Sequence, residues 1–365
     1  MHIAFAGGGT AGHVTPALSI ADAILRRSPN TKITFFTSPS GVEKGILEGY
    51  PYHTVELPIH NLSRSLSWKT ARTIVEVPRA IRRARQYLRN TQVDMVIATG
   101  GYVAYPAMIA AQRERLPNYI HESNSVAGLV TRVTAKRATA IFTNFEECKG
   151  QFSPQSNTHF VGNFILTNKG VESKKALRKR LCLGEADTLV LVMGGSLGAR
   201  KINETVIQLV KKHKRACSTL HFVISTGKKN HMDAVEQLKV EFGSLPQNIH
   251  LFPYISPMSD YWQAADIAIT RAGACTLSEL CYYRVPAIVI PFPTSAKNHQ
   301  KYNAIAYEKA GCGLLLEENE LDADSLFNKL DFLLKSPLQR QAIYCHQAQA
   351  FPVNCFNQLF SIIGI

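Results

Sequence analysis

The chain has 365 residues, 45% of them hydrophobic and 19% charged, a balance that excludes a disordered or fibrous protein and suits two α/β domains. The formal net charge of +14 indicates an anionic partner: a phosphorylated substrate, nucleic acid or an anionic membrane surface. The sequence shows neither a signal peptide nor the roughly 18 to 20 unbroken apolar residues of a membrane span. Eight cysteines without a CxxC pair are expected to be reduced thiols of a cytosolic protein.

The chain opens with an apolar strand at 1–6, the glycine-rich loop GGGTAGH, and a helix predicted from Pro16 to about Arg27, since proline suits a first helical turn. This order of elements lets backbone amides approach a diphosphate. Any tight turn between a strand and a helix also favours glycine, so the loop alone is weak evidence. His13 ends the loop and adds an ionisable side chain to the predicted anion site; a histidine that only caps the helix is the alternative.

Strand-like and helical runs then alternate, which predicts a parallel, doubly wound sheet. The expected strands are 33–37, 52–57, 93–98, 118–121, 140–143 and 158–161. Two further loops, TGGY at 99–102 and HESN at 121–124, follow strand ends. Because ligands of open α/β sheets bind at the carboxyl ends of strands, these loops and the first glycine loop are predicted to line one cleft.

Residues 64–90 hold eight basic residues and one acid, with apolar residues interspersed. One interpretation is a helix whose apolar face packs on the sheet. The arginines beside a tryptophan also fit a helix and loop on anionic lipid, and the segment has no aromatic array of the kind that stacks bases. We favour the membrane interpretation, with contact through Leu66, Trp68, Arg72, Ile74, Arg79 and Arg82.

After a lapse in the pattern and a basic helix at 173–181, the opening design repeats. A strand at 189–193 leads into the loop GGSLGAR and another helix, so the chain is predicted to contain two similar halves. The later strands are expected at 220–225, 249–252, 267–270 and 287–290, with helices at 323–334 and from 338 onward.

The stretch 270–303 carries the most specific chemistry. Gly273 allows a tight turn after a buried strand, and the helix predicted at 276–283 offers unpaired amides and a positive dipole end to a phosphate. Glu279 in this helix can accept hydrogen bonds from a ribose diol. A loop after the next strand carries polar side chains that could read a sugar, Asn298, His299 and Gln300. An ordinary strand–helix–strand unit with polar surface groups is the alternative.

Taken together, GGGTAGHVTPAL, TGGYVAYP, HESN, GGSLGAR and RAGACTLSE…PFP…NHQKYNA resemble the motifs of the MurG family, the UDP-N-acetylglucosamine–N-acetylmuramyl-(pentapeptide) pyrophosphoryl-undecaprenol N-acetylglucosamine transferases. They run from Gly7 to Asn303 in the family's order, so the resemblance covers nearly the whole chain. It implies an α/β, GT-B fold, with two Rossmann-like doubly wound parallel-sheet domains facing a central cleft. The implied reaction moves N-acetylglucosamine from UDP-GlcNAc to the muramyl 4-hydroxyl of lipid I, giving lipid II with inversion.

The resemblance also implies roles for matching residues. For such a reaction the attacking hydroxyl needs a base; the chemistry of histidine makes His13 the leading candidate, and Glu122 is the alternative. Glu279 would bind the ribose, Ser196 the phosphates and Ile255 the uracil. The full set expected at the donor is Thr10, Ala11, Gly12, Asn124, Ser196, Ile255, Ala274, Cys275, Thr276, Leu277, Ser278, Glu279, His299 and Gln300. The set expected at the acceptor diphosphate is Gly8, Gly9, Gly100, Gly101 and Tyr102.

The implied division is an acceptor- and membrane-binding domain at 1–162, a linker at 163–172, a UDP-sugar-binding domain at 173–345 and a C-terminal helix at 346–365 that packs back on the first domain. The expected location is the cytoplasmic face of the bacterial inner membrane, with cell-wall synthesis and division proteins as further partners. No tightly bound cofactor is expected. Asp322 and Asp324 have the DxD spacing of metal-binding glycosyltransferases but are predicted to cap a helix, and no visible motif requires a metal.

The sequence departs from the family pattern in places. Phe164, Ile165 and Leu166 stand where Pro-Val-Arg is usual, so an arginine expected at the donor is absent, and Ser123 and Ala127 replace glutamine and proline. Three rivals remain at this point. They are a GT-B enzyme acting on another membrane lipid such as diacylglycerol, an NAD-dependent oxidoreductase, and a nucleic-acid-binding protein. No acid clearly follows a second strand at the distance expected for NAD, and nucleic-acid binding would not explain the paired glycine loops.

Overall fold

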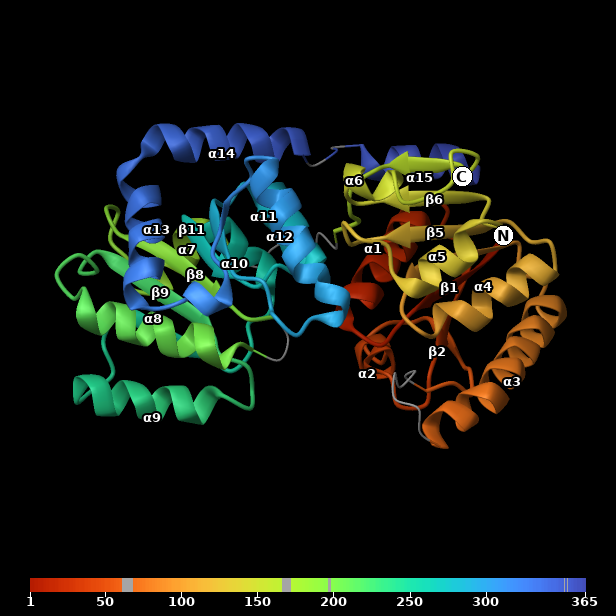
Figure 1. Cartoon of the computed structure of the whole chain (residues 1–365), viewed down its shortest axis with the longest axis horizontal. Coiled ribbons are helices and arrows are strands. Elements are labelled where there is room, and N and C mark those ends of the chain that lie inside the picture. Colours follow the sequence, from red (N-terminus) through yellow and green to blue (C-terminus); the bar gives the residue numbers. More distant parts are fainter. Residues whose placement is uncertain (61–67, 166–171, 196–197, 351, 353) are drawn as a thin grey trace. The chain divides into compact units, whose positions relative to one another are not determined.

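The computed structural model describes residues 1–60, 68–165, 172–195, 198–350, 352 and 354–365. The chain divides into two compact units, which we treat separately: unit 1 is Met1–Leu166 with Pro352–Ile365, and unit 2 is Thr167–Phe351. Each unit is built on one parallel sheet flanked by helices (Figure 1). Within the described ranges, no helix has the length and apolar character needed to cross a bilayer.

Unit 1 alternates strands and helices as its sequence predicts. Its elements are β1 (His2–Gly7), α1 (Ala11–Arg27), β2 (Lys32–Thr37), α2 (Val42–Leu47), β3 (His53–Glu56), α3 (Trp68–Asn90), β4 (Met95–Gly100), α4 (Ala104–Arg113), β5 (Asn118–Glu122), α5 (Leu129–Ala135), β6 (Ala140–Thr143), α6 (Glu146–Lys149), β7 (Thr158–Phe160) and, from the end of the chain, α15 (Cys355–Ile363).

Unit 2 repeats the alternation. Its elements are α7 (Lys174–Arg180), β8 (Thr188–Met193), α8 (Arg200–Lys212), β9 (Leu220–Ser225), α9 (His231–Phe242), β10 (Ile249–Phe252), α10 (Met258–Ala264), β11 (Ile267–Thr270), α11 (Ala274–Tyr283), β12 (Ala287–Val289), the 3-10 turn η1 (Ala296–Asn298), α12 (His299–Lys309), β13 (Leu314–Leu315), the 3-10 turn η2 (Glu318–Glu320), α13 (Ala323–Lys335) and α14 (Pro337–Ala350).

The two sheets share one strand order. In unit 1 it is β3-β2-β1-β4-β5-β6-β7, and in unit 2 it is β10-β9-β8-β11-β12-β13. In both, the order reverses beside the first strand, between β1 and β4 and between β8 and β11. This is the switch point at which open α/β sheets bind ligands. The predictions of a doubly wound parallel architecture and of two similar halves are therefore confirmed.

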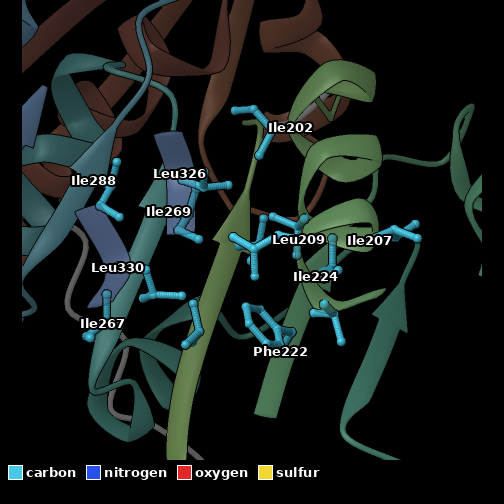
Figure 2. Close-up of a cluster of buried hydrophobic side chains, with 14 of the residues drawn as sticks. Ile202, Ile207, Leu209, Phe222, Ile224, Ile267, Ile269, Ile288, Leu326 and Leu330 are labelled. Atoms are coloured by element: carbon cyan, nitrogen blue, oxygen red, sulfur yellow. The ribbon is translucent and has the colours of Figure 1, made fainter. Parts of the chain in front are cut away.

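The central strands β1, β4 and β5 of the unit 1 sheet are buried on both faces, and β1 and β4 are mostly apolar. Ile3 and Phe5 of β1 pack with α1 and α15 on one face. Ala4 and Ala6 pack with α3, α4 and α5 on the other. In unit 2, α8 and α13 cover one face of the sheet (Figure 2), where Ile202 and Leu330 belong to the same buried cluster as the strand residue Ile269.

Three local predictions are revised or confirmed. The first helix begins at Ala11 and contains Pro16 in its second turn, so the expected start at Pro16 is wrong, and His13 lies within the helix. His299 and Gln300 lie in the first turn of α12, not on a loop. Asp322 caps α13 by accepting from the amides of Asp324 and Ser325, at 2.9 and 2.8 Å, which confirms the predicted capping role.

The end of the chain forms two helices where one was expected over 346–365. The first, α14, belongs to unit 2 and ends at Ala350, and α15 belongs to unit 1. Leu359 and Phe360 of α15 lie in the core beside α1. The expected linker at 163–172 falls largely outside the described residues.

Candidate active site

Two glycine loops meet backbone to backbone at the carboxyl edge of the unit 1 sheet. They follow β1 and β4, which are neighbours in the sheet. The Gly8 amide donates to the Gly100 carbonyl at 3.2 Å. A side chain at Gly101 would place its Cβ 1.9 Å from the Gly8 carbonyl oxygen, and Gly101 has a φ of +81°. These glycines are therefore required for the close approach of the two loops.

His13 projects from the first turn of α1 against this pair of loops. Its ring Nδ1 lies 3.1 Å from the carbonyl oxygen of Thr99, and the Thr99 hydroxyl donates to the His13 carbonyl at 2.6 Å. A Cβ on Gly100 would stand 2.7 Å from the His13 ring. Because a carbonyl only accepts, Nδ1 carries the proton, and Nε2 of the neutral ring carries the lone pair. This is the tautomer that a general base needs.

Glu122, the alternative base, is buried at the end of β5 and is 4% exposed. One carboxylate oxygen accepts from the amide and the side-chain nitrogen of Asn124, both at 3.1 Å. The other accepts from the Gly128 amide at 3.0 Å and the Thr131 hydroxyl at 2.6 Å. Four hydrogen bonds fill the lone pairs of a carboxylate. The Glu122 carboxylate thus links the loop 122–128 to α5.

The residues expected at the acceptor diphosphate lie together at this edge, but two of their amides are engaged. Gly8 donates to Gly100, and the Gly9 amide donates to a carboxylate oxygen of Glu43 at 3.0 Å. The expectation that these residues face the acceptor diphosphate remains a prediction. Tyr102 lies beside them, with its ring 3.0 Å from a Cβ built on Gly9.

The HESN motif and the departure after Gly162 share one buried region. His121 is fully buried, donates from Nε2 to the Gly162 carbonyl at 3.2 Å, and contacts the Phe164 ring edge-on with centroids 4.8 Å apart. Burial lowers the pKa of His121 to about 4, so its ring is neutral at physiological pH. Phe164 also contacts Phe356 of α15 at 5.2 Å. The unusual phenylalanine is thus a core residue that joins β5 to α15.

The donor residues of unit 2 cluster on α11, which follows β11. Its N-cap is Gly273, without a side-chain cap, and no acid lies in the first turn. Ala274, Leu277 and Ser278 are buried, and the Ser278 hydroxyl donates to the Ala274 carbonyl at 3.0 Å. The side chains of Leu277 and Ser278 therefore serve packing, and what α11 offers an anion is the backbone of its first turn.

Glu279 is the partly buried carboxylate of this helix. The Trp262 indole N–H donates to its Oε2 at 3.2 Å, which is its one hydrogen bond within the described residues. Burial raises the pKa of Glu279 to about 7, and the Trp262 hydrogen bond opposes this shift. The carboxylate consequently retains acceptor capacity for a ligand hydroxyl.

The first turn of α12 is held beside the ends of β11 and β12. Gln300 Oε1 accepts from the Phe292 amide at 3.0 Å, which leaves its side-chain nitrogen as the donor group. Asn303, also on α12, is fully buried and donates to the Ala272 carbonyl at 3.3 Å. His299 and Gln300 are therefore brought to the same edge of the sheet as the start of α11.

The remaining predicted residues are placed as follows. Thr10 and Gly12 are exposed at the start of α1, Ala11 and Asn124 are half-buried in unit 1, and Cys275 and Thr276 are half-buried on α11. Ile255 is buried just after β10. Ser196 and Leu166 lie outside the described residues, as do Leu66 and the side chains of Trp68, Arg72 and Ile74. Arg79 and Arg82 are exposed on α3, whose residues Ala80 and Leu88 pack on the sheet.

Two site-forming residues were not predicted from the sequence. One is Glu43, whose carboxylate accepts from the Gly9 amide. Arg271, which is 7% exposed at the end of β11, donates to the carbonyls of Ile290 and Pro291 at 3.3 Å and pairs with Glu318. It holds the turn that leads to α12. No group of histidine, cysteine and acidic side chains suited to a metal ion occurs within the described parts of the chain.

Two parallel α/β units, each with polar groups at the carboxyl edge of its sheet, have the architecture of the GT-B fold. A crystal structure of Acinetobacter baumannii MurG matches 100% of this chain and 99% of its own with a TM-score of 0.78 at 23% identity, and the glycosyltransferase of kitacinnamycin matches with a TM-score of 0.73 at 16% identity, which supports the fold. Residues 3–143 match the glycosyltransferase family 28 N-terminal domain and residues 189–353 its C-terminal domain.

Two relatives narrow the class. The UDP-N-acetylglucosamine–N-acetylmuramyl-(pentapeptide) pyrophosphoryl-undecaprenol N-acetylglucosamine transferase of Carboxydothermus hydrogenoformans is 35% identical over 341 residues, covering 92% of this chain and 90% of the relative. That of Caldanaerobacter subterraneus subsp. tengcongensis is 35% identical over 337 residues, covering 92% of each. The chain belongs to the MurG family.

Proposed function

We propose that this chain transfers N-acetylglucosamine from UDP-GlcNAc to the muramyl 4-hydroxyl of lipid I, giving lipid II in peptidoglycan synthesis. Two relatives that align with 92% of the chain are named as N-acetylglucosamine transferases of N-acetylmuramyl-(pentapeptide) pyrophosphoryl-undecaprenol. Within the site, the observation that supports it best is the His13–Thr99 hydrogen bond of 3.1 Å, because it fixes the ring tautomer that can accept a hydroxyl proton at Nε2.

In the proposed step, the acceptor hydroxyl oxygen attacks the anomeric carbon as Nε2 of His13 takes its proton. The bond between the anomeric carbon and the phosphate oxygen breaks, its electron pair leaves with UDP, and the configuration inverts. Negative charge grows on the departing diphosphate. The uncapped start of α11 stabilises this charge more in the transition state than in the ground state.

The donor is proposed to bind unit 2 with its ribose on Glu279 and its sugar on the side-chain nitrogen of Gln300. Glu279 supplies unfilled hydrogen-bond acceptor positions. Gln300 supplies an N–H₂ group that the hydrogen bond between its Oε1 and the Phe292 amide orients. The half-buried His299 lies beside Gln300. The predicted donor contacts of Thr10, Ala11, Gly12, Asn124, Ser196 and Ile255 remain predictions.

The test is a transfer assay with paired substrates. Radiolabelled UDP-GlcNAc is offered with lipid I or with diacylglycerol, and UDP-glucose replaces the donor in a second arm. Label appearing in lipid II only with lipid I and UDP-GlcNAc is the expected result. Label on diacylglycerol, or none on lipid I, would contradict the proposal.

We further propose that unit 1 binds the cytoplasmic face of the inner membrane peripherally through α3. The apolar residues Ala80, Ala84 and Leu88 are buried against the sheet, so the exposed arginines 79, 82 and 83 lie away from that packing. Several arginines on one face suit anionic lipid headgroups. Sedimentation with phosphatidylglycerol vesicles should exceed that with phosphatidylcholine vesicles and fall with added salt; equal binding to both would count against it.

A further inference from the structure

Glu43 is a buried acid that no step above uses. It is the second residue of the short helix α2 and is fully buried. Its Oε1 accepts from the amide of Ser38 at 3.0 Å and from the Ser38 hydroxyl at 2.7 Å. Its Oε2 accepts from the Gly9 amide at 3.0 Å. A carboxylate so far from water is tolerated because these three donors satisfy it.

The glycines around this carboxylate make room for it. A Cβ built on Gly8 would lie 2.7 Å from the Glu43 side chain, and one built on Gly41 would lie 1.9 Å from it. The carboxylate therefore fills the concave side of the first glycine loop. A negative charge there repels a diphosphate and takes an amide that a diphosphate would need.

The network continues to the second glycine loop. The Ser38 hydroxyl lies 2.7 Å from the Tyr102 hydroxyl. Because the Ser38 proton is directed at Glu43, Tyr102 must donate to Ser38. Burial raises the pKa of Tyr102, with a further contribution from Glu43, so the phenol keeps the proton it donates. One carboxylate thus connects the loops that follow β1, β2 and β4.

We infer that Glu43 is a positioning residue for His13: it fixes the loop that enters α1, and with it the histidine ring resting on Gly100. Gly9 is separated from the start of α1 only by Thr10, so a shift of the Gly9 amide moves the first turn of the helix. The inference rests on the proposed role of His13. In this proposal the glycine loop positions His13, and its Gly9 amide donates to Glu43 and not to the acceptor diphosphate.

The experiment compares Glu43→Gln with Glu48→Gln, an exposed glutamate at the end of the same helix. A glutamine keeps the shape of Glu43 but turns an N–H₂ toward one of its N–H donors. We expect Glu43→Gln to bind UDP-GlcNAc within about twofold of wild type by calorimetry. Its kcat with lipid I should fall on the order of 100-fold, as a displaced catalytic group would produce. Glu48→Gln should match wild type in both.

Ser38→Ala is the second variant. It tests whether the hydrogen-bond network of Glu43 positions His13 even if Glu43→Gln does not fold. It removes the hydroxyl link to Tyr102 but keeps the Ser38 amide, and kcat should fall on the order of tenfold, the effect of one lost hydrogen bond. A lower melting temperature with wild-type kcat in the folded variants would overturn the inference, because that is what a merely structural residue produces. Failure of the proposed function is distinguishable: it would appear as no transfer by the wild-type protein.

Discussion

The carboxylates at the two sheet edges differ in how fully the protein itself satisfies them. In unit 1, Glu43 accepts three hydrogen bonds and Glu122 accepts four, all from the surrounding loops except the one from Thr131 of α5. In unit 2, Glu279 accepts one within the described residues, from Trp262. A satisfied carboxylate fixes backbone geometry, whereas one with open acceptor positions can bind a ligand. The comparison therefore separates positioning acids from a binding acid.

The same contrast is the reason why we propose a histidine, and not a carboxylate, as the base in unit 1. A carboxylate whose lone pairs are all occupied cannot take a proton without losing a hydrogen bond. The Nδ1 of His13 is fixed by the Thr99 carbonyl, so the lone pair of the neutral ring is on Nε2. Proton transfer is thus assigned to unit 1 and donor binding to unit 2, and each can be removed without the other.

The largest expected effect is on turnover in His13→Ala. Loss of the general base should lower kcat by about 10²- to 10⁴-fold. UDP-GlcNAc affinity should stay within about twofold of wild type, because no donor contact in unit 2 is altered. Steady-state kinetics with lipid I and calorimetry on the same sample measure both. His53→Ala, at an exposed histidine of β3, is the control, and near-normal turnover in His13→Ala would remove the assignment.

Next in size is the loss of donor affinity in Glu279→Gln. Hydrogen bonds to a charged group contribute about 1.5–3 kcal/mol, so UDP-GlcNAc affinity should fall roughly 10- to 100-fold. The exposed Glu236→Gln on α9 serves as a matched control in unit 2. Unchanged affinity in Glu279→Gln would show that its open acceptor positions do not meet the ribose.

Glu122→Gln should act mainly on stability. The substituted amide cannot accept all four hydrogen bonds, so the free energy of unfolding should fall by about 1–3 kcal/mol. Denaturant unfolding measures this, with exposed Glu147→Gln as the control. A large fall in kcat with wild-type stability would instead indicate that Glu122 is the base. It would then not be a positioning acid, in contrast to the binding acid Glu279.

The last expected effect is a pH dependence of stability that comes from the buried His121. Burial holds its pKa at about 4 in the folded protein, below the usual value of 6.5. The unfolded chain therefore binds a proton first as the pH falls, and stability is lost between pH 6.5 and about 4, at up to about 1.4 kcal/mol per pH unit. His121→Gln should reduce this slope; an identical slope in both proteins would rule the contribution out.

The sequence predicted the sheets well because buried parallel strands are short apolar runs whose signal is local. It located the polar loops for the same reason, since they follow those strands. It misplaced the start of α1 because Pro16 is tolerated inside the helix, in its second turn. It missed Glu43 because the bonding partner Gly9 lies 34 residues earlier in the chain. It could not rank Glu122 against His13, since the donors that fill Glu122 reach it only through the fold.

We propose that an ionised Glu279 holds the donor. Proton release when UDP-GlcNAc binds is a direct test of this role. The Glu279 pKa of about 7 means that near neutral pH about half of these groups carry a proton. The diphosphate diester of UDP-GlcNAc does not titrate there. Calorimetric titration with UDP-GlcNAc at pH 7, in two buffers of different ionisation enthalpy, should show release of about half a proton by wild type and none by Glu279→Gln. No release by wild type, or equal release by both, would contradict the account.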